Sequence, residues 1–237
     1  MKITIQNIIK KFGDKTAVSI PEFSIADGDI IGLVGNNGAG KTTLFRLLTN
    51  LLEADEGTVF FQQDDTTISP AESEDWKKFT GVYLDDSFLL DFLTPEEYFK
   101  FVAKIEGIDE DTLQERLSAF TQFMNDEVMQ PKLIRDFSAG NKQKIGIIGA
   151  MLKQPDLLIL DEPFNYLDPS GQNQLKSLLT EYNQKSHATI LVSSHNLQFT
   201  TDISNRIVLM EKGQILKDLD GKDEQAKAEL NAYFYEA

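Results

Sequence analysis

The sequence predicts an α/β protein built on a buried, mainly parallel sheet, with a strand-rich N-terminal part and an inserted block of helices. Three observations predict this class. Short apolar strands alternate with helices after residue 140, strand patterns dominate residues 1 to about 70, and the pattern changes to helix between about 86 and 136. Strand–helix alternation with continuously apolar strands is typical of a parallel sheet covered on both faces.

The elements before residue 86 are predicted from short apolar runs. KITIQNI, IIGLVG and TVFFQQ are each expected to form a strand, because apolar and β-branched residues dominate them and Gly or Asp turns separate them. One helix interrupts these strands; it begins near Gly40, and its apolar residues recur at helical spacing. They are Leu44, Leu47, Leu48 and Leu51.

The inserted block is predicted to begin with a helix whose start is marked by TPEE. Thr94 is the expected N-cap, Pro95 occupies the first helical position and Glu97 closes a capping box. Two apolar sets at helical spacing follow, and we expect both to pack into the core rather than to bind a cofactor. The first set is Tyr98, Phe101, Val102 and Ile105, and the second, in a second helix, is Leu113, Leu117, Phe120 and Met124.

After the block, the strands LLILD, TILVSS and RIVLM are expected to complete the core. A helix between the first two carries Leu175, Leu178, Leu179 and Tyr182. We therefore predict a single domain with three parts. Residues 1–85 and 141–217 form an α/β core with an N-terminal antiparallel β subdomain, 86–140 form the inserted helical subdomain, and 218–237 form a C-terminal helical tail.

Composition limits the classes of function. The chain has 237 residues, enough for one substantial core or for a core with an inserted subdomain. It has no cysteine, which excludes disulfides and thiolate metal sites. Its formal net charge of −15 argues against nucleic acid as the main partner, because duplex binding draws on clustered Lys and Arg. A nucleotide is still allowed, since backbone N–H groups can bind phosphate whatever the net charge.

Nothing in the sequence predicts a secretion signal or a membrane span. The N-terminal stretch MKITIQNIIKKF lacks an uninterrupted apolar run, and no segment approaches the roughly 18 consecutive apolar residues that a span needs. We therefore expect that, if the protein acts at a membrane, another chain supplies the spanning segments.

The stretch GNNGAGKTT follows a predicted strand, opens a predicted helix and fits the phosphate-loop pattern G-x-x-x-x-G-K-[ST]. N–H groups of such a loop point inward around a phosphate, where side chains would obstruct them. Lys41 is expected to reach the β- and γ-phosphates and Thr42 to offer its hydroxyl to Mg²⁺, while the helix N-terminus adds partial positive charge. The predicted nucleotide-binding residues here are Gly35, Asn36, Asn37, Gly38, Ala39, Gly40, Lys41, Thr42 and Thr43.

The stretch LLILDEP ends a predicted buried strand with two carboxylates. The C-terminal tips of parallel strands are where α/β proteins bind ligands. We expect Asp161 to hold Mg²⁺ through water and Glu162 to orient or deprotonate the attacking water. The alternative is a solvated acidic turn before Pro163.

With these motifs in place, four further stretches make the sequence resemble the ATP-binding subunit of ABC transporters. FSAGNKQK at 137–144 is similar to the family signature LSGGQ, and NYLD at 165–168 stands in the place of the D-loop. VSSH ends in His195 at the position of the switch histidine, and KKFG puts Phe12 where the family stacks an aromatic ring on adenine. The resemblance runs from about residue 2 to residue 217. It implies a P-loop NTPase fold with a RecA-like core, ATP and Mg²⁺ as ligands, and ATP hydrolysis.

The resemblance also implies how the site is assembled. Two subunits sandwich two ATPs, each held by one chain's phosphate loop and the other chain's signature, so that loss of the γ-phosphate loosens the dimer. Ser138 and the N–H groups of Ala139 and Gly140 would cap the γ-phosphate in trans from a helix N-terminus, and Asn141 completes this set. His195 would contact the γ-phosphate and help to position the water. The catalytic residues implied are Lys41, Glu162 and His195.

Three positions depart from the family pattern. Ala139 replaces a signature glycine and adds a methyl group where backbone meets phosphate, and Asn141 replaces glutamine. Asp85 stands where the Q-loop glutamine belongs; a carboxylate can still bind Mg²⁺, but it adds negative charge near the γ-phosphate. We therefore predict a working but slowed ATPase with Asp85 as a further metal ligand. The alternative is that Asp85 and Asp86 are only a loop acid pair in a shifted register.

The resemblance implies an energy-coupling subunit, cytoplasmic and peripheral on the inner face of the cell membrane. It would act as a homodimer or heterodimer on separate integral membrane subunits, which the Q-loop and the helical insert would contact. Export is the predicted direction, because the chain leaves no room after its final strand for the extra C-terminal domain of many importers. The main alternative is a non-transport scaffold or regulatory ATPase with weakened hydrolysis. ATPases of DNA repair and tandem translation factors fit poorly, since the sequence has no heptad run and one phosphate loop.

Overall fold

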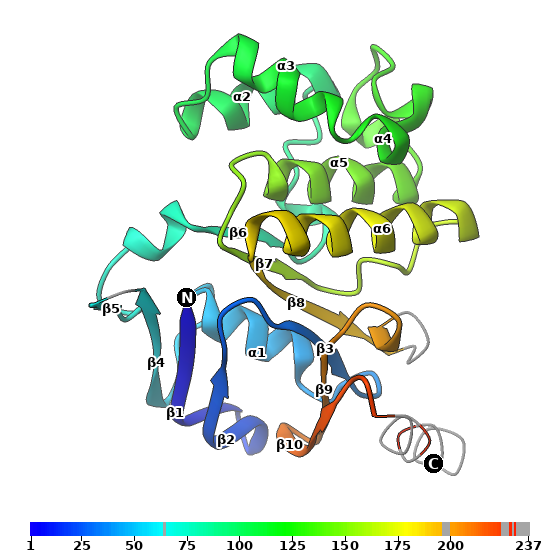
Figure 1. The fold of residues 1–237 in the computed structure, drawn as a ribbon. Helices are drawn as coiled ribbons and strands as arrows, with labels where there is room; N and C mark the ends of the chain where they lie inside the picture. Colours follow the sequence, from blue (N-terminus) through cyan, green and yellow to red (C-terminus); the bar gives the residue numbers. More distant parts are fainter. Residues whose placement is uncertain (64, 196–199, 224–227, 229, 231–237) are drawn as a thin grey trace.

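The protein, described here by a computed structural model, contains two β-sheets, and helices pack on both sides of the larger one (Figure 1). The structure describes residues 1–63, 65–195, 200–223, 228 and 230. The strands of the larger sheet are β3 (Ile30–Val34), β6 (Thr80–Tyr83), β7 (Leu157–Leu160), β8 (Thr189–Ser194), β9 (Arg206–Glu211) and β10 (Gln214–Asp220). They follow the order β10-β9-β3-β8-β7-β6, and every neighbouring pair is parallel except β10 with β9. The predicted, mainly parallel sheet is confirmed.

The smaller sheet is antiparallel and lies in the N-terminal part, as predicted. Its strands are β1 (Lys2–Phe12), β2 (Lys15–Ile25), β4 (Glu56–Gln63) and β5 (Thr66–Ile68), in the order β2-β1-β4-β5. The strand β2 is not among those predicted. It contains Pro21, which lacks a backbone donor, and its position at the edge of the sheet explains why it tolerates this residue.

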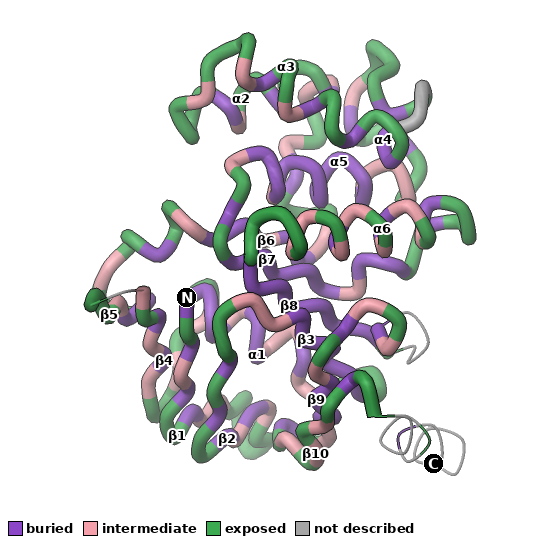
Figure 2. The backbone as a smooth tube through the Cα atoms, viewed as in Figure 1, coloured by how far each residue is buried: buried purple, intermediate pink, exposed green. Residues whose placement is uncertain are grey.

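Among the described residues, three helices cover the larger sheet, and the side chains of its strands alternate between the two sides. The helix α1 (Lys41–Leu48) lies on one side, and α5 (Ala139–Met151) and α6 (Pro169–Ser186) lie on the other (Figure 1). In β7, Leu157 and Ile159 join the core beneath α1 and the smaller sheet, whereas Leu158 and Leu160 join the core beneath α5 and α6. Figure 2 shows the result: the central strands and α5 are mostly buried.

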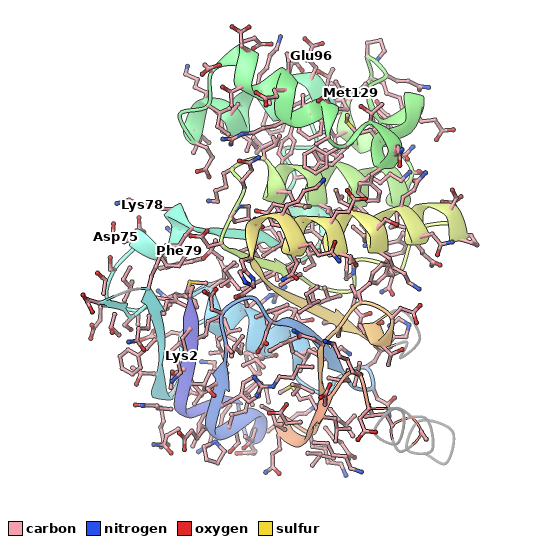
Figure 3. All side chains as sticks on the ribbon, viewed as in Figure 1. Lys2, Asp75, Lys78, Phe79, Glu96 and Met129 are labelled. Atoms are coloured by element: carbon pink, nitrogen blue, oxygen red, sulfur yellow. The ribbon has the colours of Figure 1, made fainter. Side chains whose placement is uncertain are left out.

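The inserted block lies beyond α5, so that α5 separates it from the sheet (Figure 1). It contains α2 (Pro95–Ile105), α3 (Glu110–Ser118) and α4 (Thr121–Val128). The predicted capping box is confirmed: Thr94 N–H donates to Glu97 Oε2 at 2.8 Å, and Glu97 N–H donates to Thr94 Oγ1 at 3.3 Å. Glu96 and Met129, labelled in Figure 3, mark this outer block.

Three predictions about helical packing are wrong. The apolar residues expected on one helix are buried, namely Leu113, Leu117, Phe120 and Met124, but they are divided between two helices, because 3₁₀-type hydrogen bonds at Ala119 and Phe120 end α3. In α2 the inner face carries Phe99 and Ala103, which leaves two residues expected in the core exposed. These are Phe101 and Ile105, whose side chains are 44% and 66% exposed. Leu51, expected on the inner face of α1, lies beyond its end and is also exposed.

Two expected boundaries also shift. The strand β10 continues to Asp220, so residues 218–220 extend the sheet instead of opening a helical tail. The helix α5 begins at Ala139, inside the range assigned to the inserted block. Most of the predicted tail lies outside the described residues, although Leu230 is buried against Val34 and Leu209. Within the described parts of the chain, no helix is long and apolar enough to cross a bilayer.

Candidate nucleotide-binding site

The phosphate loop connects β3 to α1 and is pressed against neighbouring backbone. A Cβ on Gly35 would stand 2.2 Å from the carbonyl oxygen of Met210 in β9. Gly40 has a left-handed φ of 107°, and a Cβ there would stand 2.6 Å from the carbonyl oxygen of Ala17 in β2. Glycine is needed at both positions because β9 and β2 approach the loop so closely. This requirement is additional to the phosphate contact expected from the sequence.

The loop opens onto a cleft of about 320 Å³. Phe12, at the end of β1, contributes to the cleft wall and is 54% exposed, which leaves its ring accessible. The cleft is lined by Phe12, Lys15, Ala17, Glu162 and residues 37–43. Asn36 instead closes the turn, where its carbonyl oxygen accepts the N–H of Ala39 at 3.0 Å. The structure thus brings the predicted aromatic residue, the loop and one carboxylate to a single cleft.

The three residues expected to be catalytic form one network. The buried Lys41 Nζ donates to the Gly35 carbonyl at 2.6 Å and lies 3.2 Å from Glu162 Oε1. The other carboxylate oxygen of Glu162 lies 2.9 Å from Nδ1 of His195 and accepts the backbone N–H of His195 at 3.2 Å. The carboxylate of Glu162 therefore contacts the ammonium group that the phosphate-loop pattern assigns to a phosphate.

The second carboxylate, Asp161, is buried at the tip of β7 and held by two hydroxyl groups. Thr42 Oγ1 donates to Asp161 Oδ2 at 2.5 Å, and Ser193 Oγ donates to Asp161 Oδ1. Ser193 Oγ also accepts the N–H of Glu162 at 2.8 Å, so one side chain supports both acidic residues. Burial raises the pKa of Asp161 above its ordinary value, and the hydrogen bonds from Ser193 and Thr42 act in the opposite direction.

The pairing of Thr42 with Asp161 fits a magnesium site of the kind predicted. Mg²⁺ keeps several waters and typically uses one or two protein oxygens together with phosphates of the substrate. No group of three or more His, Cys, Asp or Glu side chains within the described ranges is arranged to hold a metal by itself. An ion at Thr42 and Asp161 would therefore need the nucleotide to complete its coordination.

The side chain of Asp85 is engaged locally. Its carboxylate accepts the N–H of Ser87 at 2.9 Å and also the hydroxyl of the same residue, and it lies 3.6 Å from Nη2 of Arg46 in α1. It lines a second cleft, of about 270 Å³, together with Asp161 and Glu162. A contact with a metal there stays a prediction.

The signature residues begin α5 and present their first turn to solvent. Ser138 is the N-cap, and its Oγ accepts the N–H of Asn141 at 3.3 Å. Ser138 and Ala139 are exposed, and Nδ2 of Asn141 donates to Glu127 of α4 at 3.1 Å. Residues 138–141 do not appear among the described residues that line the phosphate-loop cleft. The signature residues of one chain are therefore accessible to a nucleotide bound to another chain.

Residues that contact this site and are absent from the predicted site residues include Lys15, Arg46, Gln143 and Ser193. The side chain of Gln143 is buried and bonds to the backbone carbonyl of Glu162, at 3.0 Å. Ser193 and Gln143 both lie inside stretches that the motifs delimit, TILVSS and FSAGNKQK. A polar residue inside an apolar strand tip was the available signal for Ser193. No signal in the sequence indicates that Arg46 pairs with Asp85.

A phosphate loop opening a helix, beside two carboxylates at the tip of a parallel strand, defines a P-loop nucleotide-binding ATPase. A family profile described as ABC transporter matches residues 18–165. The chain therefore belongs to the ABC transporter family, as an ATP-binding and ATP-hydrolysing subunit. Subunits of this kind form dimers and work with membrane subunits.

Known relatives cover most of this chain. It is 30% identical over 217 residues to the probable sulfate/thiosulfate import ATP-binding protein CysA of Chlorella vulgaris, which covers 92% of this chain and 90% of the relative. It is 30% identical over 221 residues to the bacitracin transport ATP-binding protein BcrA of Enterococcus faecalis, with 92% and 69% covered. A solved ATP-binding subunit of an ABC transporter superposes with a TM-score of 0.85 at 25% identity, covering 99% of this chain and 98% of that one.

Proposed function

We propose that this subunit binds Mg-ATP in the cleft at the phosphate loop and hydrolyses it to power transport through separate membrane subunits. The observation that carries the proposal is the convergence of the expected groups in one place. Lys41, Glu162 and His195 form a continuous network, and the pair of Thr42 and Asp161 lies on the same loop and strand tip.

The contacts suggest an order of events on binding. Lys41 would turn from Glu162 to the β- and γ-phosphates, which frees the carboxylate of Glu162 to accept a proton from the attacking water. His195, already bonded to the other oxygen of Glu162, would keep that carboxylate oriented. Mg²⁺ held by Thr42 and Asp161 would neutralise charge on the phosphate oxygens. Phe12 would stack on the adenine ring.

The signature supports a site shared between two copies or between this chain and a related one. Ser138 and Ala139 are exposed at the N-terminus of the 13-residue helix α5, where N–H groups and the helix dipole favour an anion. In the proposed dimer these groups cap the γ-phosphate of the ATP bound to the other chain.

Exposed apolar side chains support docking to the membrane subunits through the helical insert. Phe88 and Phe92 are 55% and 59% exposed, in the segment that follows Asp85, and Phe101 and Ile105 are exposed on α2. Apolar side chains of this size are usually covered by a partner when they gather in one region. The inner face of the cell membrane stays a prediction from the family resemblance. Export stays a prediction from the sequence, since relatives carry import as well as transport names.

The substitution Glu162→Gln tests the proposed chemistry. We expect ATP turnover to be abolished, ATP binding to survive and a stable ATP-bound dimer to accumulate, because the variant keeps the binding groups and loses the base. Turnover is measured by phosphate release and dimer formation by size-exclusion chromatography with light scattering. Turnover at the wild-type rate would remove Glu162 from the mechanism. Transport direction is read from vesicles that contain the subunit together with its membrane partners.

The departures from the family pattern favour one second candidate, a regulatory ATPase with weakened hydrolysis. The methyl group of Ala139 lies on the exposed first turn of α5, and Asp85 places a carboxylate in the cleft that contains Glu162. Both would disfavour charge that develops on a γ-phosphate. We expect Asp85→Gln and Ala139→Gly to raise turnover. If both variants turn over ATP at or below the wild-type rate, the slowing hypothesis is wrong.

A further inference from the structure

The backbone of Glu162 adopts a conformation that needs outside support. Its φ is 48°, in the left-handed region that residues with a Cβ rarely occupy. The peptide groups on both sides of this residue are held by side chains from other elements. Ser193 of β8 accepts the N–H of Glu162 at 2.8 Å, and Gln143 of α5 donates its Nε2–H to the carbonyl of Glu162 at 3.0 Å. Such strained positions persist where the surroundings hold them in place.

Gln143 uses both ends of its amide on the same loop. Its Oε1 accepts the N–H of Tyr166 at 3.3 Å, while its Nε2 donates to Glu162. The side chain is 2% exposed, so water does not replace these contacts if they are lost. The loop is also packed tightly against the start of the same helix, because a Cβ on Gly140 would stand 2.5 Å from the carbonyl oxygen of Tyr166.

Gln143 does not line the phosphate-loop cleft, although it lines the second cleft beside Glu162 and Asp85. The phosphate-loop cleft is lined, within the described part of the chain, by residues of β1, β2, the phosphate loop and Glu162, and Gln143 is not one of them. Its contacts reach the carboxylate of Glu162 only through the backbone. A change at Gln143 should therefore alter where this carboxylate lies, while the phosphate loop and Phe12 keep their places.

We propose that Gln143 is a positioning residue for the catalytic carboxylate: its amide holds the left-handed backbone of Glu162 and fixes it to the first turns of α5. The proposal rests on the proposed function, in which Glu162 activates the attacking water. Ser193 holds the N–H side of the residue and Gln143 the carbonyl side, so the carboxylate stays within reach of both Lys41 and His195. Small displacements of a reacting group are costly, since about 1 Å can lower a rate about 100-fold.

The test compares two substitutions at Gln143 with a matched control. Gln143→Met keeps the length of the side chain and removes both hydrogen bonds, whereas Gln143→Glu keeps an acceptor for Tyr166 and loses the donor to Glu162. The control is Gln172→Met, because Nε2 of Gln172 donates to the carbonyl of Phe164 at 3.1 Å in the same loop, but from α6 and without touching Glu162. All three variants and the wild type are assayed for ATP turnover, for Mg-ADP binding by calorimetry and for thermal unfolding.

We expect both Gln143 variants to lower kcat by about 10- to 100-fold. KM should not rise and Mg-ADP binding should not weaken, and the control should stay within about twofold of wild type in kcat. In a Glu162→Gln background, where turnover is already abolished, Gln143→Met should leave the Mg-ADP affinity of that variant within about twofold, because both changes act through one carboxylate. Equal losses of kcat at Gln143 and Gln172, a rise in KM with kcat unchanged, or weaker Mg-ADP binding would overturn the proposal. So would failure of both Gln143 variants to fold, which would assign the residue to structure. Wild-type protein without turnover, or Glu162→Gln with full turnover, would instead overturn the proposed function.

Discussion

The contact between Lys41 and Glu162 predicts that removing the catalytic carboxylate strengthens nucleotide binding. In the structure Lys41 Nζ, 6% exposed, lies 3.2 Å from a carboxylate that is 21% exposed. A phosphate that binds at Lys41 must replace this carboxylate. At an effective dielectric constant near 20 the direct attraction is about 5 kcal/mol, and desolvation and partial exposure reduce the net value to about 1–2 kcal/mol. Glu162→Gln should therefore tighten binding about 5- to 30-fold, since 1.4 kcal/mol is tenfold.

The measurement is calorimetry with Mg-ADP. ADP engages Lys41 through its β-phosphate but lacks the γ-phosphate expected to hold the dimer, so tighter binding cannot come from dimer trapping. In the absence of nucleotide the same variant should unfold more readily, by about 1–2 kcal/mol, because Lys41 loses its charged partner. A suitable control is Glu106→Gln, which breaks a Lys153 pair of similar length, 3.0 Å, away from the cleft. If Glu162→Gln binds ADP no better than wild type, Glu162 does not compete with the phosphate and this reasoning is refuted.

Three further predictions concern charge, stacking and stability. Burial raises the pKa of Asp161, so the folded state binds the proton of this carboxyl group more tightly than the unfolded state does. In EDTA, the stability of the wild type relative to Asp161→Asn should therefore fall as the pH rises from about 3.8 through the folded-state pKa. Urea unfolding measures this difference in stability, and a difference that stayed constant across the range would contradict the prediction. Phe12→Ala should weaken ATP binding about 10-fold, because the adenine ring loses its stacking partner. Pyrophosphate, which lacks adenosine, should bind unchanged, and competition calorimetry measures both affinities. Thr94→Ala should lower the free energy of unfolding by about 1 kcal/mol through loss of the capping box and leave turnover intact, as thermal unfolding and phosphate release would show.

The sequence was sufficient for the parts of the site that local patterns determine. The phosphate loop follows a five-residue apolar strand and opens a helix, so its position at a strand tip follows from the order of residues alone. The carboxylates Asp161 and Glu162 follow another such strand, and parallel strands bring their C-terminal tips to one edge. The capping box at Thr94 is equally local. Each of these features depends on neighbours within a few positions.

The features that were missed depend on contacts between distant parts of the chain. The orientation of Phe101 depends on which face of α2 packs inward, and that face carries Phe99 and Ala103, which are buried in the core. The pairing of Asp85 with Arg46 brings together residues on different elements, and nothing in either stretch announces it. The same holds for Gln143, which was not predicted as a site residue and which contacts the backbone of Glu162, 19 positions further along the chain.

The charges around the cleft argue that nucleotide and metal bind together. Asp161 and Glu162 lie side by side at the strand tip, and Glu162 already pairs with the ammonium group of Lys41. If a polyphosphate bound without a metal ion, its negative oxygens would replace the carboxylate of Glu162 at the ammonium group of Lys41, and the negative charge near the two carboxylates would increase. The hydroxyls of Thr42 and Ser193 hold Asp161 in place but add no charge. Since burial already opposes ionisation of Asp161, a divalent cation beside it relieves both the carboxylate and the phosphate, which makes Mg²⁺ part of the binding event as well as of the chemistry.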